Sequence, residues 1–317
     1  MTSEVTREYL ILIRTPFQAW LAEKVIEAES VVSFDLLYFT QNASAEDHFY
    51  YSRLAKKSRD ARFVYFAKQV PDILNHLRLA FAVWPFVFGR RYDATMVSSI
   101  DSYVFNAIAN RRFAGELVTF DDGTANYNKS GVYFQDSSAL KARLYTLFFG
   151  ATSVKAVRTK IDRHYTTQSN MDNIVDRDRL YKVSAWEDSE SPSDSQLPPR
   201  VYFIGAPFEE FLDSRKIELL ESRVRDMEVS VYVKHPRENN PLELGVPFLE
   251  KSGKIAEEAI LEDASCQPIV LIGSLSSVMF NMANRADRRI VFVPDNTGHQ
   301  DSFIELARRS GCEIEFI

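Results

Sequence analysis

Adjacent carboxylates at Asp121 and Asp122 follow the β-prone run LVTF and are followed by Gly123. An Asp-Gly pair is a common turn signal, so a solvated turn is one interpretation. Neighbouring acids in a cleft have a second use, because each disfavours ionisation of the other and one of them can then accept a proton. The motif is therefore a candidate general base, and the rest of the chain has to decide between the two interpretations.

A His-Pro pair ends a second β-prone run, VSVYV. His235 and Pro236 stand there, with Lys234 before them and Arg237 after them. The proline cannot extend the strand and biases His235 towards an extended backbone. The flanking cations favour an anionic ligand, and a histidine at such a place can hydrogen-bond or protonate a leaving phosphate. The alternative is an exposed loop histidine.

A serine-rich motif, IGSLSSVMFN, follows a third run, PIVLI. Gly273 makes the turn, and Ser274, Ser276 and Ser277 cluster at the start of a predicted helix. The free N–H groups and the positive end of the helix dipole form an anion site, to which hydroxyls add donors. The alternative is that Ser274 or Ser276 only caps the helix. Capping and phosphate binding do not exclude each other, so both stay open.

Strand-like and helix-like segments alternate around these motifs and must position them. Such alternation predicts parallel sheets covered by helices. We predict two α/β domains, residues 1–165 and 200–317, joined by a linker or exposed loop over 166–199 that is rich in serine, proline and acid. Strands are expected at 8–13, 34–40, 61–67, 92–99, 115–120, 200–205, 229–234, 267–273, 289–295 and 312–317, and helices at 15–28, 45–59, 70–84, 101–113, 213–226, 274–286 and 301–311.

All three motifs come at carboxyl ends of predicted strands, where ligands bind in sheets of this kind. Two such domains that face each other form a cleft. One domain then supplies a base for an acceptor hydroxyl, and the other holds a phosphate and assists its departure. This combination predicts group transfer from a nucleotide-linked donor.

Composition excludes several other classes of protein. The net charge of −6 over 317 residues argues against a binder of duplex nucleic acid, which needs a basic surface. The two cysteines make a disulfide framework improbable, and no Cys/His cluster has zinc spacing. The apolar run Leu10–Ile13 is too short for a signal peptide. We therefore expect a cytoplasmic protein without a nucleic-acid partner.

One apolar stretch, LAFAVWPFVFGRR at residues 79–91, is uncharged for eleven residues and then basic. It is shorter than the ~20 residues of a spanning helix. A buried helix end broken at Pro85 is one interpretation. The other is a shallow contact with a partner or with the surface of a membrane, which would make the protein peripheral to the inner membrane.

The ordered motifs resemble those of glycosyltransferase family 52, the lipooligosaccharide sialyltransferases. The opening LIRTPFQAWLAEKVI resembles that family's N-terminal strand, its Thr-Pro-hydrophobic-Gln motif and its helix. TFDDGTANYN and VKHPRE resemble its later motifs, and YFIGAPFEE resembles a Gly-x-Pro segment that precedes the His-Pro strand. The resemblance spans nearly the whole chain.

The resemblance implies a GT-B-like pair of Rossmann-type domains, CMP-N-acetylneuraminic acid as donor and a terminal galactose as acceptor. It implies one inverting displacement with no cofactor and no essential metal. Asp122 or Asp121 then deprotonates the acceptor, and His235 acts on the CMP phosphate as an acid. The implied donor-binding residues are Gly205, Lys234, Pro236, Arg237, Gly273, Ser274, Ser276 and Ser277, and the acceptor-binding residues are Thr15, Gln18, Gly123 and Thr124.

The chain departs from the family pattern after the Gly-x-Pro segment. There the family often has an acidic pair followed by glycine, whereas this chain reads APFEEFLDSRK. The base therefore stays open among Asp122, Glu210 and Asp213, although acids in a first helical turn also suit the helix dipole. An Asp-x-Asp metal motif is absent because position 123 is glycine.

Two alternative functions stay open. One is a related glycosyltransferase with another donor such as a UDP-sugar, because nothing in the sequence reads the base of the nucleotide. The other is a non-catalytic module that binds a nucleotide sugar. The oligomeric state, a monomer or a homodimer, also stays open.

Overall fold

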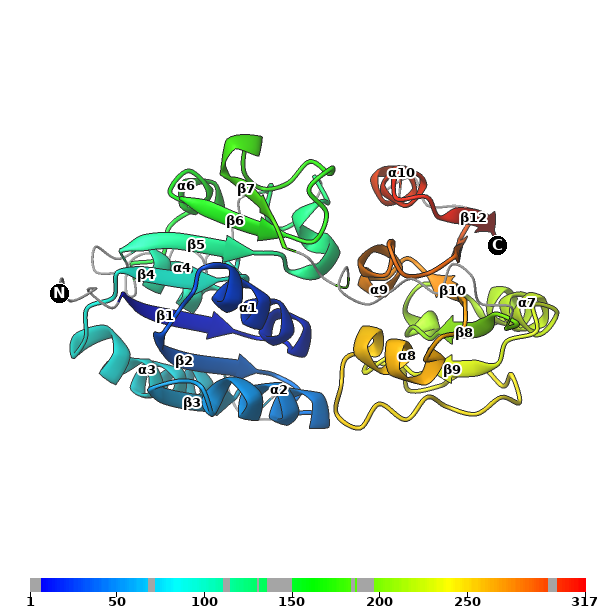
Figure 1. The fold of residues 1–317 in the computed structure, drawn as a ribbon, viewed down its shortest axis with the longest axis horizontal. Coiled ribbons are helices and arrows are strands. Elements are labelled where there is room, and N and C mark those ends of the chain that lie inside the picture. Colours follow the sequence, from blue (N-terminus) through cyan, green and yellow to red (C-terminus); the bar gives the residue numbers. More distant parts are fainter. Residues whose placement is uncertain are drawn as a thin grey trace. The chain divides into compact units, whose positions relative to one another are not determined.

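A computed structural model describes residues 7–67, 72–110, 115–129, 131–135, 150–183, 186, 197–295 and 301–317. The chain divides into two compact units, Met1–Ala185 and Trp186–Ile317. Each unit is a parallel sheet with helices on its faces (Figure 1). The predicted α/β class is confirmed.

The first unit has a seven-stranded sheet in the order β3-β2-β1-β4-β5-β6-β7. All six pairings are parallel. Its elements are β1 (Glu8–Ile13), α1 (Pro16–Ala28), β2 (Ser33–Thr40), α2 (Ala45–Ala55), β3 (Asp60–Tyr65), α3 (Asp72–Phe88), β4 (Ala94–Val97), α4 (Tyr103–Ala109), β5 (Glu116–Phe120), η1 (Gly123–Asn126), α6 (Val154–Arg158), β6 (Arg163–Thr166), η2 (Arg177–Arg179) and β7 (Leu180–Lys182).

The second unit has a five-stranded parallel sheet in the order β12-β11-β10-β8-β9. Its elements are β8 (Arg200–Ile204), η3 (Phe208–Glu210), α7 (Ser214–Arg225), β9 (Val231–Val233), α8 (Ala256–Ala264), β10 (Ile269–Ser274), α9 (Ser277–Asn281), β11 (Arg288–Val293), α10 (Asp301–Arg309) and β12 (Glu313–Phe316).

Local sequence explains where the first helices begin. Thr15 caps α1 by accepting a hydrogen bond from the backbone N–H of Gln18 at 3.2 Å, and Pro16 occupies the first turn, where no N–H is needed. Ser44 and Asp47 form a capping box at the start of α2.

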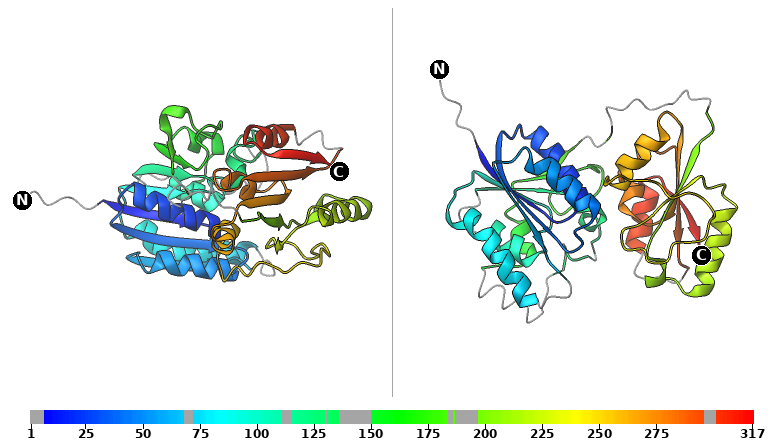
Figure 2. Two further views of the ribbon diagram at one scale, coloured as in Figure 1. Left: turned by 45° about the vertical axis from the view of Figure 1, so that its right-hand side comes forward. Right: turned by 90° about the horizontal axis from the view of Figure 1, so that it is seen from below.

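Successive side chains along the strands of the first sheet point to opposite faces and pack in two separate hydrophobic cores. Leu10 and Leu12 of β1 pack in a cluster with Leu79 of α3 and Phe105 of α4. The intervening side chains, such as Ile11, are buried on the other face. Figure 2 shows α1 and α2 on one side of this sheet and α3 on the opposite side. Both faces are thus covered, as in other parallel sheets.

The predicted linker differs from the structure at its beginning. Instead of an exposed loop from residue 166, the chain forms β7, which pairs with β6 and adds a strand to the edge of the first sheet. Ile174 and Val175 are buried in the core of this unit. A three-residue strand and two isolated apolar residues among polar ones give too little periodicity for sequence analysis to detect.

Candidate active site

The carboxylate of Asp122 receives hydrogen bonds from three side chains. Nε2 of Gln18 donates to Oδ1 at 2.6 Å, and the hydroxyls of Tyr133 and Ser99 donate to Oδ2 at 2.8 and 3.2 Å. The amide of Gln18 is itself held, because its oxygen accepts from the backbone N–H of Arg14 at 2.8 Å. Asp122 is half-buried. It is therefore an oriented carboxylate that keeps access to solvent.

These side chains gather at the centre of the first sheet. Gln18 follows β1, Ser99 follows β4 and Asp122 follows β5. From β1 the chain continues to β2 on one side, whereas β4 lies on the other side of β1. This is a topological switch point, where the loops at the carboxyl ends of strands leave a crevice for a ligand. The structure thus brings the predicted residues Gln18 and Asp122 into one site.

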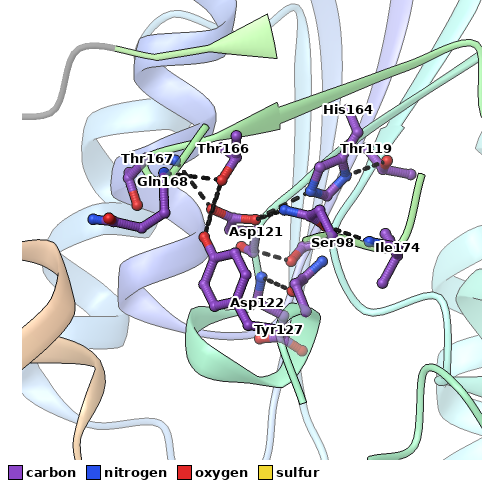
Figure 3. A network of polar contacts seen from close by, with 12 residues as sticks. Ser98, Thr119, Asp121, Asp122, Tyr127, His164, Thr166, Thr167, Gln168 and Ile174 are labelled. Atoms are coloured by element: carbon purple, nitrogen blue, oxygen red, sulfur yellow. Dashed lines mark hydrogen bonds and ion pairs between the residues drawn. The ribbon is translucent and has the colours of Figure 1, made fainter. Parts of the chain in front are cut away.

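Asp121 has a different environment from its neighbour. Its side chain is 1% exposed, and both of its oxygens are used within the protein (Figure 3). Oδ2 accepts from Tyr127 Oη at 2.5 Å, Thr166 Oγ1 at 2.7 Å and Thr167 N at 3.0 Å, and Oδ1 lies 3.2 Å from Asn173 Nδ2 and 3.1 Å from His164 Nε2. A carboxylate that is enclosed in this way cannot reach a sugar hydroxyl. The geometry does not support Asp121 as a base; it holds the turn that presents Asp122.

His164 was not selected by sequence analysis, although it belongs to this network. Its Nδ1 lies 2.7 Å from the hydroxyl of Thr119, and its Nε2 faces Asp121. A hydroxyl, an imidazole and a carboxylate in a row resemble a nucleophilic triad. All three side chains are at most 1% exposed, so no substrate can approach the hydroxyl. The row is a structural support for the loop after β5.

Asp101 is a second residue that sequence analysis missed. Burial raises the pKa of its carboxyl, the negative charge of Asp122 raises it further, and Arg14 opposes both effects. Oδ1 of Asp101 is buried without a hydrogen-bond partner among the residues that the structure describes. A carboxyl whose pKa is raised by a neighbouring acid therefore exists at this site, but it is Asp101, whose neighbour is Asp122. Asp101 is the first residue of the helix predicted over 101–113, and its closeness to Asp122 depends on the fold and is not visible in the sequence.

The other predicted acceptor residues lie on the same loops. Thr15 is committed to capping α1. Gly123 begins η1 with a φ of 58°, a conformation that glycine adopts without strain. The side chain of Thr124 lies outside the described residues.

His235 of the second unit follows β9 and is half-buried. Burial, together with the positive charges of Arg237 and Lys251, lowers the pKa of its imidazole to about 4. Nδ1 accepts from the backbone N–H of Arg237 at 3.1 Å, which assigns the proton of the neutral ring to Nε2. His235 thus presents one N–H donor at neutral pH.

Gly205 after β8 is required by close packing. A Cβ at this position would lie 2.3 Å from Oε2 of Glu238 and 2.8 Å from the ring of Tyr232. Glu238 is buried and accepts from Tyr232 Oη at 2.5 Å and from the backbone N–H of His235 at 3.1 Å. Burial raises the pKa of its carboxyl. Gly205 therefore admits the acid that fixes the backbone of the His-Pro loop.

The serine motif differs in part from its prediction. Ser274 is the last residue of β10, and α9 contains only five residues instead of extending over 274–286. A Cβ at Gly273 would meet the carbonyl oxygen of Ile204 at 2.6 Å, so this position needs a glycine. Ser276 precedes α9, yet its hydroxyl makes no capping bond and is buried without a partner among the described residues. Capping therefore does not account for this hydroxyl.

The acidic loop after β8 lies beside the His-Pro loop. Nη1 of Arg237 is 3.6 Å from Oε2 of Glu210, and both side chains are exposed. Asp213 caps α7 by accepting from the backbone N–H of Lys216 at 2.9 Å. Its side chain is also exposed. Both acids stay accessible to a substrate, and Asp213 has a structural role as well.

Strand order explains why these loops meet. From β8 the chain passes to β9 on one side, then crosses back to β10 on the other side. Gly205 and His235 lie in the loops after β8 and β9, and Ser274 is the last residue of β10. This is the switch point of the second sheet, and the sequence motifs of this unit converge on it.

Two independent comparisons identify the family and the fold. Residues 33–296 match the model of glycosyltransferase family 52. The chain belongs to glycosyltransferase family 52. The family 52 chain is 26% identical over 281 residues to the CMP-N-acetylneuraminate:beta-galactoside alpha-2,3-sialyltransferase of Pasteurella multocida, with 88% of each protein covered. It is also 26% identical over 288 residues to the N-acetyllactosaminide alpha-2,3-sialyltransferase of Haemophilus influenzae, with 90% of the chain and 91% of that protein covered.

Solved structures place the family 52 chain among GT-B glycosyltransferases. TcCGT1 in complex with UDP is similar with a TM-score of 0.56 at 12% identity, covering 98% of this chain and 86% of that one. UGT73P12 of Glycyrrhiza uralensis is similar with a TM-score of 0.52 at 9% identity, covering 99% and 83%. At such low identity the likeness concerns the fold alone. The GT-B prediction is confirmed.

Proposed function

We propose that this family 52 glycosyltransferase is an inverting sialyltransferase that moves N-acetylneuraminic acid from its CMP donor to a terminal galactose. The proposal rests mainly on three relatives that are named alpha-2,3-sialyltransferases. Each of them aligns with at least 82% of this chain. The chemistry of the two switch points supports it, because one presents an oriented carboxylate and the other presents donors for an anion.

The second unit suits the phosphate of the donor. Nε2–H of His235 is a hydrogen-bond donor, and Lys234 and Arg237 add positive potential. When the bond between the sugar and the phosphate oxygen breaks, negative charge develops on that oxygen. A hydrogen bond from His235 stabilises this charge, and a proton can follow because the anionic donor raises the pKa of the ring.

A carboxylate must take the proton of the galactose hydroxyl as its oxygen attacks the anomeric carbon. Asp122 is oriented for this role by Gln18 and Tyr133. Asp213 has only Oδ1 engaged in its capping bond and is exposed. Glu210 is the third candidate. Substitution of each acid in turn distinguishes the three candidates by their effect on kcat.

The names of the relatives support a proposal for the acceptor and the linkage. We infer an α-2,3 linkage to a galactose of a surface glycan such as lipooligosaccharide. We also infer that catalysis needs no metal, since the carboxylate and the cationic loop supply the acid–base and electrostatic steps.

The test is incubation of the full chain with CMP-N-acetylneuraminic acid and lactose, with and without EDTA, followed by mass spectrometry. The expected product is sialyllactose at equal rates in both reactions, and it should be cleaved by a sialidase that is specific for α-2,3 linkages. Transfer from a UDP-sugar instead, with no binding of CMP in calorimetry, would establish another donor. Binding of CMP without transfer to any galactoside would indicate a non-catalytic module.

A further inference from the structure

Arg14 differs from the other half-buried arginines that the structure describes in the first unit. Each of the others donates to a carboxylate or to a carbonyl oxygen: Arg53, Arg90, Arg158, Arg163 and Arg179. The guanidinium of Arg14 has no ion pair and no hydrogen bond among the described residues. Burial removes water from a cation, so a half-buried guanidinium normally has protein partners. Arg14 is therefore a candidate for binding a ligand.

The position of Arg14 is fixed although its charge is unpaired. Its guanidinium carbon lies 5.5 Å from the centre of the buried ring of Phe39, and a guanidinium over an aromatic face keeps its N–H edges available. The backbone N–H of Arg14 donates to Oε1 of Gln18 at 2.8 Å. A guanidinium that is held in this way can pair with both oxygens of a carboxylate.

Arg14 lies at the switch point of the first sheet, beside two acids. It directly follows β1, and the amide of Gln18 connects its backbone to the carboxylate of Asp122. Its positive charge also acts on the carboxyl of Asp101. Neither acid forms an ion pair with it among the described residues. These two carboxylates would repel an anionic group of a substrate unless a cation faced that group, and Arg14 supplies such a cation.

We propose that Arg14 binds the carboxylate of the sugar that the enzyme transfers. This inference rests on the proposed function, because N-acetylneuraminic acid has a carboxylate on its anomeric carbon. The galactose acceptor is neutral, and the phosphate of the donor has proposed partners in the second unit. The sugar carboxylate is thus the substrate anion that still lacks a partner. It is bonded to the carbon that the acceptor oxygen attacks, so it comes close to the acceptor hydroxyl during the reaction.

This role would make Arg14 a determinant of donor specificity. A sugar with a carboxylate pairs with the guanidinium, whereas a neutral sugar takes away its water and leaves it without a partner. A site that leaves its own polar group unpaired discriminates strongly against the wrong substrate. Arg14 would therefore favour acidic sugars over the neutral sugars of other nucleotide donors.

The first test is calorimetry of the full chain with CMP and with CMP-3-fluoro-N-acetylneuraminic acid. The fluorine slows transfer by disfavouring positive charge at the anomeric carbon, and only this second ligand has the carboxylate. Arg14→Met keeps an apolar side chain over Phe39 and removes the charge. We expect its affinity for the fluorinated donor to fall at least about tenfold, with the affinity for CMP unchanged. Arg14→Lys keeps a charge without the planar fork and should lie between wild type and Arg14→Met.

Turnover and a matched control complete the test. With neutral lactose as acceptor, Arg14→Met should raise the KM for the donor at least about tenfold and leave the KM for lactose unchanged. Arg62→Met removes an exposed arginine of the same unit, which lies 3.9 Å from Asp60, and should change neither KM. Circular dichroism of each variant separates lost binding from misfolding.

The possible results separate this inference from the function on which it rests. Equal affinity of wild type and Arg14→Met for the fluorinated donor, in an enzyme that transfers the sugar, would overturn the inference alone. An equal loss of affinity for CMP would also overturn it, by assigning the guanidinium to the phosphate. A rise in the KM for lactose alone would do so by assigning it to the acceptor. A wild type that neither binds nor transfers the CMP-linked sugar would overturn the proposed function and this inference together.

Discussion

The amide nitrogen of Gln18 lies 2.6 Å from the carboxylate of Asp122, across 104 positions of sequence. This one bond joins the Thr-Pro-Phe-Gln motif to the Asp-Asp-Gly motif. Because the same nitrogen also donates to Ser99 at 2.8 Å, three loops of the first sheet depend on Gln18.

Gln18→Ala should therefore impair the acceptor half of the reaction. Loss of the amide frees the carboxylate of Asp122 to reorient, and small misplacements of catalytic groups are costly. We expect kcat to fall at least about tenfold, while the affinity for CMP in calorimetry is unchanged because the proposed donor residues lie in the second unit. Thr15→Ser keeps a capping hydroxyl and should retain activity. A parallel loss of CMP binding would contradict this separation.

Asp121→Asn should act on stability. The amide group places N–H hydrogens where hydroxyl and backbone donors already point at a buried carboxylate. We expect the free energy of unfolding in urea to drop by about 2 kcal/mol or more, since unmatched buried donors are costly. Asp122→Asn serves as the control. Because Asp122 is half-buried, we expect a smaller drop in the free energy of unfolding. Equal stability of the two variants would show that the network around Asp121 is dispensable.

The identity of the base can be determined with three variants: Asp122→Asn, Glu210→Gln and Asp213→Asn. Replacing the base should lower kcat by about 10²–10⁴. The other two variants should lose less than about tenfold. Turnover is measured with saturating donor, and CMP affinity confirms that each variant keeps its donor site. Asp213→Asn still accepts the capping bond of α7, so a large loss there would indicate chemistry. Undiminished turnover in all three would reject every candidate.

The lowered pKa of His235 predicts that the stability of the protein depends on pH. Its folded pKa of about 4 lies below the ordinary value of 6.5, so the unfolded chain takes up this proton first as the pH falls. The contribution of His235 is constant above pH 6.5, becomes unfavourable as the pH falls from 6.5 to 4, and then levels off. Urea unfolding at pH 7 and pH 5 should show a larger loss for wild type than for His235→Gln. Identical losses would contradict the lowered pKa.

Binding of CMP should raise the lowered pKa of His235. A bound phosphate favours the protonated imidazole, so the NMR titration midpoint of His235 should move upward in the complex. A midpoint that does not respond to CMP would place His235 away from the donor phosphate.

Arg237 should matter for binding and little for folding. Its ion pair with Glu210 is exposed and 3.6 Å long, which is worth under about 0.5 kcal/mol. Arg237→Ala should raise the KM for the anionic donor about tenfold at low salt, and the effect should shrink as salt increases. Arg309, in an equally exposed pair with Glu305 at the end of α10, is the matched control. An equal rise of KM in Arg309→Ala would indicate a general charge effect.

The sequence was sufficient to predict strands β1 to β5 and β8 to β12 and the loops that form the two candidate sites. Gln18, Asp122 and His235 follow buried strands and Ser274 ends one, and runs of β-prone residues are detectable without tertiary information. Strand order was not predictable, because it depends on non-local pairing. Without it, neither switch point could be located.

The burial of individual side chains was the other property that could not be predicted from the sequence. Asp121 and Asp122 are equivalent in a sequence, and only the network around Asp121 distinguishes them. Asp101 acquires its environment from Arg14 and Asp122, which are distant along the chain. The sequence prediction missed strand β7 and made helix α9 too long. Elements of three and five residues are too short to show a periodic pattern of apolar side chains.

The division of labour between the two aspartates bears on attempts to change what the enzyme accepts. A mutant library that randomises both positions would contain many members of reduced stability, because Asp121 is enclosed by the hydrogen bonds that hold the loop after β5. Diversity placed at Asp122 and at loop positions around it would leave the scaffold intact. The boundary between what can be redesigned and what must be kept thus passes between two consecutive residues.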